Sequence, residues 1–206
     1  MTLIDFEQRL LSAQNRLKKA TAALAPKHIG GEWEAYQAAY QEVISLERQI
    51  AAIKNESLAV PIEFPVAWDC GAPLPVVISN NWRTFLIFLS AEADEDGNFP
   101  FALVEFKRSA SVKFGSPNDE VFRGHPLYGR GLEPYTAQRV INSAWITELE
   151  NINKVHHGYS PDMWRSLIHY VSWFHDSTFE CVAASFVVEI FHESLLQIMT
   201  RIHDRL

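Results

Sequence analysis

The side chains most able to do chemistry cluster in one apolar part of the sequence. Residues 174–181 read Phe-His-Asp-Ser-Thr-Phe-Glu-Cys and lie between two mostly apolar segments, 168–173 and 182–188. A polar group that is buried without a hydrogen bond costs about 1–3 kcal/mol. The histidine, carboxylates, hydroxyls and thiol of this stretch therefore form either a structural hydrogen-bond network or a functional site.

Further side chains of this kind lie in an irregular region upstream. Residues 114–132 contain four glycines and two prolines, which indicates defined loop backbone, and such loops often carry function. The candidate catalytic site combines two imidazoles and two carboxylates: His125, His175, Asp176 and Glu180. Asp119 and Glu120 are additional carboxylates. Imidazole and carboxylate groups suit zinc, manganese or iron, and a carboxylate beside a histidine can orient a general base.

The spacing of these residues gives such a site little support. The sequence contains no HExxH motif, so we assign no metal ligands and identify no cofactor. Adjacent strand residues point to opposite faces, which separates His175 from Asp176. The structural interpretation is therefore preferred, with Asp176 capping a turn and Glu180 paired with a basic or hydroxyl neighbour. Three arginines are candidates for that neighbour: Arg123, Arg130 and Arg139.

The two cysteines, Cys70 and Cys181, are far apart and form no CxxC motif. They suit reduced, buried thiols of a cytoplasmic protein better than a disulfide framework. Burial on an apolar strand should raise the pKa of Cys181, which favours an inert thiol over a nucleophile.

A string of motifs runs through the same part of the chain. It comprises Phe-Gly-x-Pro-Asn-Asp-Glu at 114–120, Gly-His-Pro-Leu at 124–127, Gly-Leu at 131–132, Asn-Ser-x-Trp-Ile at 142–146 and Phe-His-Asp-Ser-Thr-Phe-Glu-Cys at 174–181. This string resembles a group of uncharacterised bacterial proteins. The resemblance covers about 114–184 and implies a bacterial cytoplasmic setting, but it assigns no catalytic residue.

The elements that must position these residues are expected to form an α+β domain over 58–206, with a mostly antiparallel sheet. Short β-branched and aromatic segments between turn signals predict strands at 76–78, 82–89, 99–106 and 137–141. The spacing also predicts a helix at 145–155, with Ser143 as its N-cap, and a C-terminal helix at 190–202. The acidic turn at 94–98 lacks the spaced ligands of a calcium loop.

The stretch 168–184 allows two interpretations. Its β-branched and aromatic residues favour a hairpin of two strands, 168–174 and 178–184, with the turn at 175–178. The alternative is a helix that starts at Ser177, because Ser177 and Glu180 have the spacing of a capping box. The absence of a helical apolar stripe favours the hairpin.

Residues 1–57 have a different pattern, with apolar residues at alternating spacings of three and four in two runs, 3–24 and 36–53. This predicts an antiparallel helical hairpin with coiled-coil-like seams, separated at Pro26 and Gly30. Each seam is too narrow to be a core alone. The hairpin therefore packs on its own domain, binds a protein partner or forms a homo-oligomer.

Charge and composition narrow the class of protein. A net charge of −7 disfavours nucleic-acid binding, and the sequence has neither a secretion signal nor an apolar run long enough for a membrane. We therefore expect a bacterial cytoplasmic protein-interaction module, such as an immunity-like or defence-associated adaptor that self-associates through the helical hairpin. The alternative is a metal-dependent hydrolase that uses His125, His175, Asp176 and Glu180.

Overall fold

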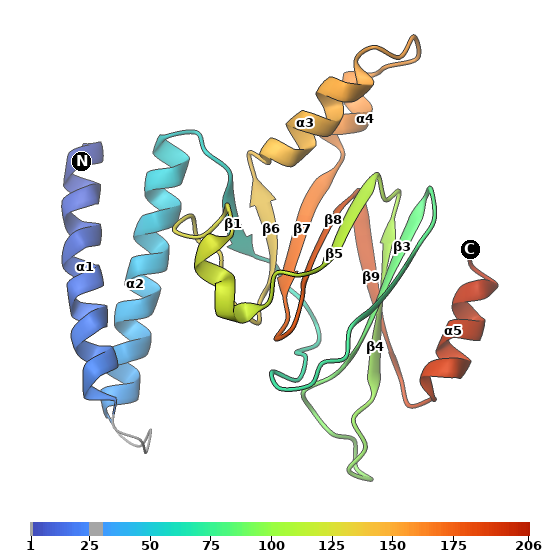
Figure 1. The fold of residues 1–206 in the computed structure, drawn as a ribbon, viewed down its shortest axis with the longest axis horizontal. Helices are drawn as coiled ribbons and strands as arrows, with labels where there is room; N and C mark the ends of the chain where they lie inside the picture. Colours follow the sequence, from blue (N-terminus) through green and yellow to red (C-terminus); the bar gives the residue numbers. More distant parts are fainter. Residues whose placement is uncertain (1, 25–30) are drawn as a thin grey trace.

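The computed structural model describes residues 2–24 and 31–206. The fold is α+β with an N-terminal helical hairpin, antiparallel strands and a C-terminal helix, as predicted (Figure 1). The strands form two sheets, whereas the sequence predicted one. In Figure 1 the hairpin α1–α2 flanks one sheet, the second sheet follows, and α5 covers the far side. None of the helices in the described ranges has the length and apolar character needed to cross a membrane.

The first sheet has five strands in the order β1-β6-β7-β8-β5, all antiparallel to their neighbours. Their bounds are β1 Leu58–Pro61, β5 Ser111–Gly115, β6 Ala137–Ile141, β7 Ile168–Trp173 and β8 Thr178–Ala183. The second sheet has the order β2-β3-β4-β9, with β2 Val76–Ser79, β3 Arg83–Leu89, β4 Phe101–Lys107 and β9 Ser185–Phe191. Because β8 leads directly into β9, one stretch of chain passes from the first sheet to the second.

The two sheets face each other across an aromatic core. Trp68 lies 5.0 Å from Phe174 between ring centroids, and Phe106 lies 5.1 Å from Phe179. Such aromatic pairs contribute about 0.5–1.5 kcal/mol each beyond their buried area. The opposite face of the second sheet is covered by α5 (Leu195–His203), which buries Ile198 and Ile202 against it.

The strands β7 and β8 form the hairpin that the sequence favours over a helix. Phe174 donates its backbone N–H to the carbonyl of Ser177 at 2.9 Å and so closes the turn. Period-two alternation on β8 places Phe179 and Cys181 in the core between the sheets. Glu180 consequently points to the outer face of the five-stranded sheet.

The helical hairpin consists of α1 (Leu3–Ala23) and α2 (Gly31–Ile53), which pack on each other around Ala13, Val43 and Leu46. The expected connection at Pro26 and Gly30 lies outside the described residues. A different side of α2, which carries Arg48 and the buried residues Ile44 and Ala51, docks on the sheet domain.

One arginine fastens α2 to the sheet domain. Arg48 donates to the carbonyl of Ala59 at 2.9 Å and to that of Gly131 at 3.0 Å, and it forms an ion pair with Glu133. Gly131 has a φ of +83°, and a Cβ there would lie 2.6 Å from the Ala59 carbonyl oxygen. Only glycine fits this close approach.

Several sequence-based expectations require correction. The C-terminal helix does not begin at 190, because residues 185–191 pair along β4 as strand β9 and the Ser194 side chain caps the helix that follows. Two strands of the first sheet, β1 and β5, are absent from the strands predicted from the sequence. Cys70 is exposed rather than buried.

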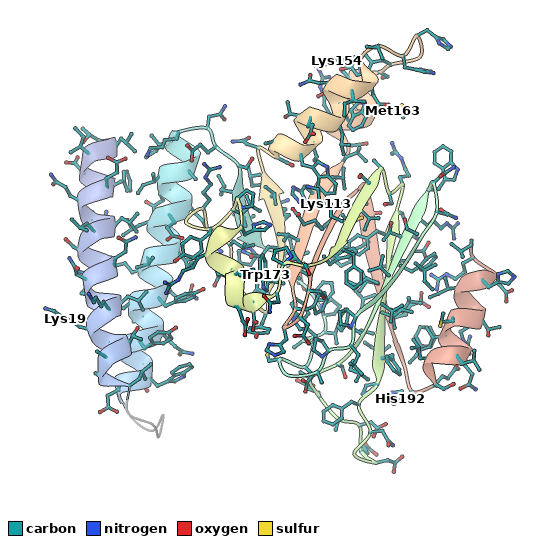
Figure 2. The ribbon with its side chains drawn as sticks, viewed as in Figure 1. Lys19, Lys113, Lys154, Met163, Trp173 and His192 are labelled. Atoms are coloured by element: carbon teal, nitrogen blue, oxygen red, sulfur yellow. The ribbon has the colours of Figure 1, made fainter. Side chains whose placement is uncertain are left out.

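Two helices at the end of the five-stranded sheet complete the fold. The helix α3 (Ala144–Asn153) begins after Ser143, whose side chain accepts the N–H of Ile146 as predicted for an N-cap. A short helix α4 (Pro161–Arg165) follows it, before β7. A 3₁₀ segment, η1 (Asp119–Gly124), crosses the outer face of the sheet above Trp173 (Figure 2), and its Phe122 ring lies 4.9 Å from the Trp173 ring.

Candidate functional site

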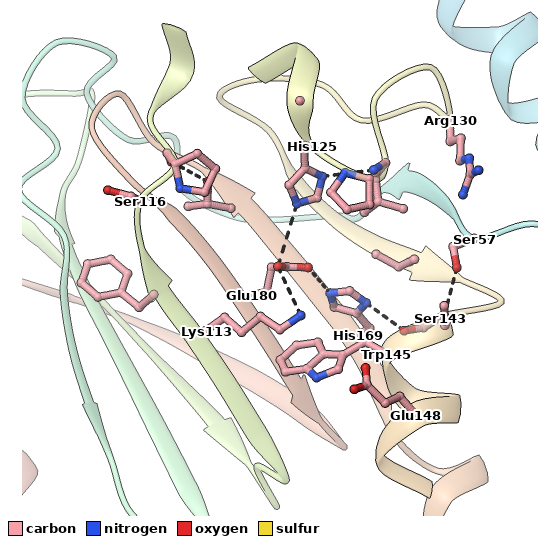
Figure 3. A pocket seen from close by; sticks show the side chains of 18 residues that line it. Ser57, Lys113, Ser116, His125, Arg130, Ser143, Trp145, Glu148, His169 and Glu180 are labelled. Atoms are coloured by element: carbon pink, nitrogen blue, oxygen red, sulfur yellow. Dashed lines mark hydrogen bonds and ion pairs between the residues drawn. The ribbon is translucent and has the colours of Figure 1, made fainter. Parts of the chain in front are cut away.

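A pocket of about 460 Å³ lies on the outer face of the five-stranded sheet (Figure 3). Its walls are the loop after η1, the start of α3 and the edge strand β5. The lining is apolar over Leu127, Val140 and Trp145, and its polar side chains include those of His125, His169 and Glu180. A mostly apolar concavity with a few convergent polar groups is typical of a small-molecule site.

Glu180 is the centre of the polar floor. Its Oε2 accepts a hydrogen bond from Nε2 of His169 at 2.8 Å, and its Oε1 lies 3.8 Å from Nζ of Lys113. Its side chain is 13% exposed and that of His169 is 5% exposed. Strand register explains both contacts: Lys113 is directly opposite Glu180 on β5, and His169 is its diagonal neighbour on β7.

The environment keeps this carboxyl ionised. Burial would raise the pKa of Glu180, but the imidazoles of His125 and His169 and the ammonium group of Lys113 outweigh burial and hold the pKa well below its ordinary value. A strongly perturbed carboxyl in a cleft is a marker of functional sites, although structural ion-pair networks also produce it.

His125 presents a hydrogen-bond donor to the pocket. The N–H of Leu127 donates to Nδ1 of His125 at 3.2 Å, so Nδ1 carries no proton and the neutral ring carries its proton on Nε2. That Nε2 lies 3.9 Å from Oε1 of Glu180, which is longer than a hydrogen bond. The Nε2–H of His125 is therefore oriented toward the Glu180 carboxylate at the floor of the pocket, which His125 lines.

The polar chain continues from His169 to the start of α3. Nδ1 of His169 lies 2.9 Å from Oγ of Ser143. Because Nε2–H donates to the Glu180 carboxylate, Nδ1 of the neutral ring is an acceptor, and Ser143 donates its hydroxyl proton to it. Ser143, His169 and Glu180 thus form a continuous relay that Figure 3 shows along one side of the pocket.

Trp145 and Lys113 form the side wall nearest β5. Lys113 Nζ lies 3.8 Å from the centroid of the Trp145 ring, within the range of a cation–π interaction. The edge of the His169 ring system also meets Trp145, at 5.0 Å between centroids. The indole is therefore fixed by two contacts and presents an apolar surface to the pocket.

The structure divides the predicted site into two places. His125 and Glu180 meet at the pocket, whereas His175 and Asp176 lie in the β7–β8 turn and do not line it. Asp176 is exposed, with 83% of its side-chain surface accessible, and its Oδ1 lies 3.9 Å from Nε2 of His175. Glu120 is also exposed.

His175 instead forms a second cluster with Asp119. Nδ1 of His175 lies 2.8 Å from Oδ2 of Asp119, and the same oxygen accepts the hydroxyl of Tyr135 at 2.7 Å. The hydrogen bond and charge of Asp119 raise the pKa of His175. Hydrogen bonds from Tyr135 and His175 lower the pKa of Asp119. This cluster ties η1 to the β7–β8 turn.

His169, Lys113 and Ser143 are the members of the polar chain that the candidate site omitted. The signal for His169 was in the sequence: positions 169, 171 and 173 share one face of β7, and hairpin pairing brings that face beside Glu180. The basic partners of Glu180 are therefore histidines and a lysine, not the arginines considered from the sequence.

Two further kinds of site, a metal site and a reactive thiol, were considered from the sequence. Within residues 2–24 and 31–206, no three or more His, Cys, Asp or Glu side chains are placed to hold a metal ion. Burial raises the pKa of the Cys181 thiol to about 11, and its sulfur lies 3.5 Å from the Ser109 hydroxyl. That thiol packs in the core between the sheets.

Four of the five motif segments noted in the sequence contribute lining residues. They include Pro117 from 114–120, His125 from 124–127, Trp145 from 142–146 and Glu180 from 174–181. No family model, no curated protein and no solved structure matches this chain.

Proposed function

We propose that this chain is a binding protein whose pocket takes a small uncharged organic ligand with an apolar body and a carbonyl-type acceptor. The observation that carries this is a concave, mostly apolar pocket whose polar floor already pairs its own charges. The sequence favoured a protein-interaction module over a metal-dependent hydrolase, so a small-molecule ligand is a different kind of partner, proposed here from the pocket.

The preference for an uncharged ligand follows from the ion pairs at the rim and the floor of the pocket. Lys113 and His169 face Glu180, and Arg130 lies 3.2 Å from Glu56 at the rim. A charged ligand placed against this floor would have to break one of these pairs or remain uncompensated there. A neutral group loses less hydration free energy than a charged group when it leaves water.

The acceptor on the ligand is assigned to the donor on His125. Nε2 of His125 lies 3.9 Å from Oε1 of Glu180, beyond hydrogen-bond distance, so a carbonyl oxygen can accept a short hydrogen bond from this N–H in place of the longer contact with Glu180. The body of the ligand would lie against Trp145, Leu127 and Val140, all of which line the pocket.

NMR of the ligand signals and of the protein signals with 1-phenylpentan-2-one, a neutral ketone that carries a phenyl group, tests the proposal. We expect saturation transfer to the ketone and broadening of the Trp145 indole signal. We also expect about fivefold weaker binding in Trp145→Ala and in His125→Phe, since one lost hydrogen bond or aromatic contact contributes about 1 kcal/mol. Trp33→Ala, a change on the exposed arm, should bind as the wild type does. Equal binding by all variants would contradict the proposed site.

Self-association through the arm is a separate proposal, motivated by the outer face of α1. Ile4 and Leu11 are 65% and 62% exposed and lie seven residues apart, so they share one face of the helix. Light scattering of the wild type and of an Ile4→Glu/Leu11→Glu double variant tests it. We expect the wild type to be a dimer and the double variant a monomer, and identical masses would contradict the proposal.

A further inference from the structure

We infer that Ser143, His169 and Glu180 form the nucleophile, the general base and the positioning carboxylate of a serine esterase site that acts on small neutral carboxylic esters. This inference rests on the proposed function, because the ester would enter the same pocket. Its acyl carbonyl would lie at the start of α3 beside Ser143, not at the His125 N–H that is assigned to the ketone. A reaction is thereby added to what would otherwise be a binding site.

The relay has the contacts that activate a serine. The hydroxyl of Ser143 is 2.9 Å from His169 Nδ1, and His169 Nε2 is 2.8 Å from the Glu180 carboxylate. Hydrogen bonds of this length between nucleophile, base and orienting group are the geometric signature of acyl transfer, whichever fold carries them. The two ring nitrogens exchange roles relative to the commonest serine triads, in which Nε2 faces the nucleophile.

The carboxylate has the protonation state that this role requires. Glu180 must remain ionised to hold the proton of His169 on Nε2 and to stabilise the imidazolium when it forms. Its contacts with two imidazoles and Lys113 supply that state. Glu180 therefore acts through His169 and is a positioning residue.

The place of Ser143 in the fold also favours the reaction. It precedes a ten-residue helix, α3, and both Ser143 and Trp145 line the pocket. Negative charge that develops on the carbonyl oxygen is stabilised by the dipole of a helix near its N-terminus. The N–H groups of Ala144 and Ile146 already donate to the hydroxyls of Ser57 and Ser143, so this stabilisation comes from the helix as a whole and not from those two groups. A capping serine needs only to accept the N–H of Ile146, so capping does not require a buried imidazole–carboxylate pair behind it.

The chemical steps balance without a cofactor. Oγ of Ser143 bonds to the acyl carbon while its proton passes to Nδ1 of His169. The bond from the acyl carbon to the leaving oxygen then breaks, and His169 returns the proton to that oxygen, which releases an alcohol. Water repeats the two transfers at the acyl-serine, releases the carboxylic acid and restores the hydroxyl of Ser143.

The experiment uses p-nitrophenyl butyrate as substrate and phenylmethylsulfonyl fluoride as a covalent probe on the full chain. We expect hydrolysis above the rate of the buffer and one sulfonyl group added to Ser143, located by peptide mass spectrometry. Ser143→Gly should abolish both, while replacement of an N-cap serine by glycine costs helix stability only a few tenths of a kcal/mol. Glu180→Gln should lower kcat about 10²–10⁴-fold with little change in KM.

Ser194→Gly is the matched control, since Ser194 caps α5 far from the pocket and its loss should leave hydrolysis and labelling unchanged. Hydrolysis and labelling that persist in Ser143→Gly would overturn the esterase inference, as would their absence from the wild type. Binding of 1-phenylpentan-2-one is measured on the same samples. Ketone binding without labelling leaves the binding site in place and removes only the esterase, whereas loss of both removes the proposed function as well.

Discussion

Replacing Glu180 by alanine should destabilise the protein by about 3 kcal/mol. The carboxylate accepts a hydrogen bond from buried His169, and hydrogen bonds to charged groups contribute about 1.5–3 kcal/mol. Removing it also leaves the His169 N–H without an acceptor in a buried position, whereas Lys113, whose side chain is 53% exposed, adds about 0.5 kcal/mol or less. In a chain of 206 residues, 3 kcal/mol corresponds to a fall of about 6–12 °C in Tm.

Urea unfolding at pH 7 measures this free energy, with thermal unfolding as a second probe. Glu148→Ala is the matched control, because Glu148 lines the same pocket but is exposed, and we expect a change within about 0.5 kcal/mol. Glu180→Gln should cost about 1 kcal/mol, since its amide oxygen still accepts from His169 but without the charge. If the free energy of unfolding of Glu180→Ala lies within about 0.5 kcal/mol of the wild-type value, the carboxylate does not stabilise the folded protein, which would refute this prediction.

The stability difference between the wild type and Glu180→Gln should depend on pH, and its direction follows from the pKa of Glu180. The folded pKa of Glu180 is lowered, so its stabilisation is fully present above the ordinary value of 4.5. Below that pH the unfolded chain takes up the proton first, and the advantage of the wild type over Glu180→Gln should shrink as pH falls. A difference that stays constant from pH 7 to pH 3 would mean that folding does not perturb this carboxyl.

The raised pKa of His175 predicts the opposite sign for the second cluster: its stabilisation is present below the ordinary value of 6.5 and is lost as pH rises through the folded pKa. NMR titration of the His175 ring should show a higher pKa in the wild type than in Asp119→Asn, and equal pKa values would exclude the ion pair. Gly131→Ala should destabilise by about 2 kcal/mol or more in urea unfolding, because a positive φ and a backbone carbonyl both oppose a side chain; a change under 0.5 kcal/mol would contradict the close approach. A thiol reagent should modify exposed Cys70 in the native protein and reach buried Cys181 only on unfolding, so rapid native labelling of both would refute the placement of Cys181.

The sequence predicted best the features that depend on local pattern. Alternation of apolar residues identified the β7–β8 hairpin, and the cap at Ser143 was recognised from a residue type before a helical segment. The strand at 185–191 was misassigned in part because short apolar runs suit either a helix or a strand, and its pairing with β4 decides.

The candidate site was only half recoverable because its members meet through strand register and loop packing. Neighbours in sequence such as His175 and Glu180 lie apart, while Lys113 and His169 reach Glu180 from two different strands. His125 comes from a loop whose path is fixed by contacts such as Nδ1 to the Leu127 N–H. Nothing in the spacing of single motifs encodes these distances.

Arg48 gives the helical hairpin a thermodynamic connection to the pocket. This side chain of α2 holds the carbonyl of Gly131, and the loop that ends there supplies His125, Leu127 and Arg130 to the pocket wall. Any partner that binds α2 and alters this anchor changes the affinity of the pocket by some factor. Reciprocity then requires that a ligand in the pocket change the affinity for that partner by the same factor, so one residue would make the arm and the pocket two linked sites.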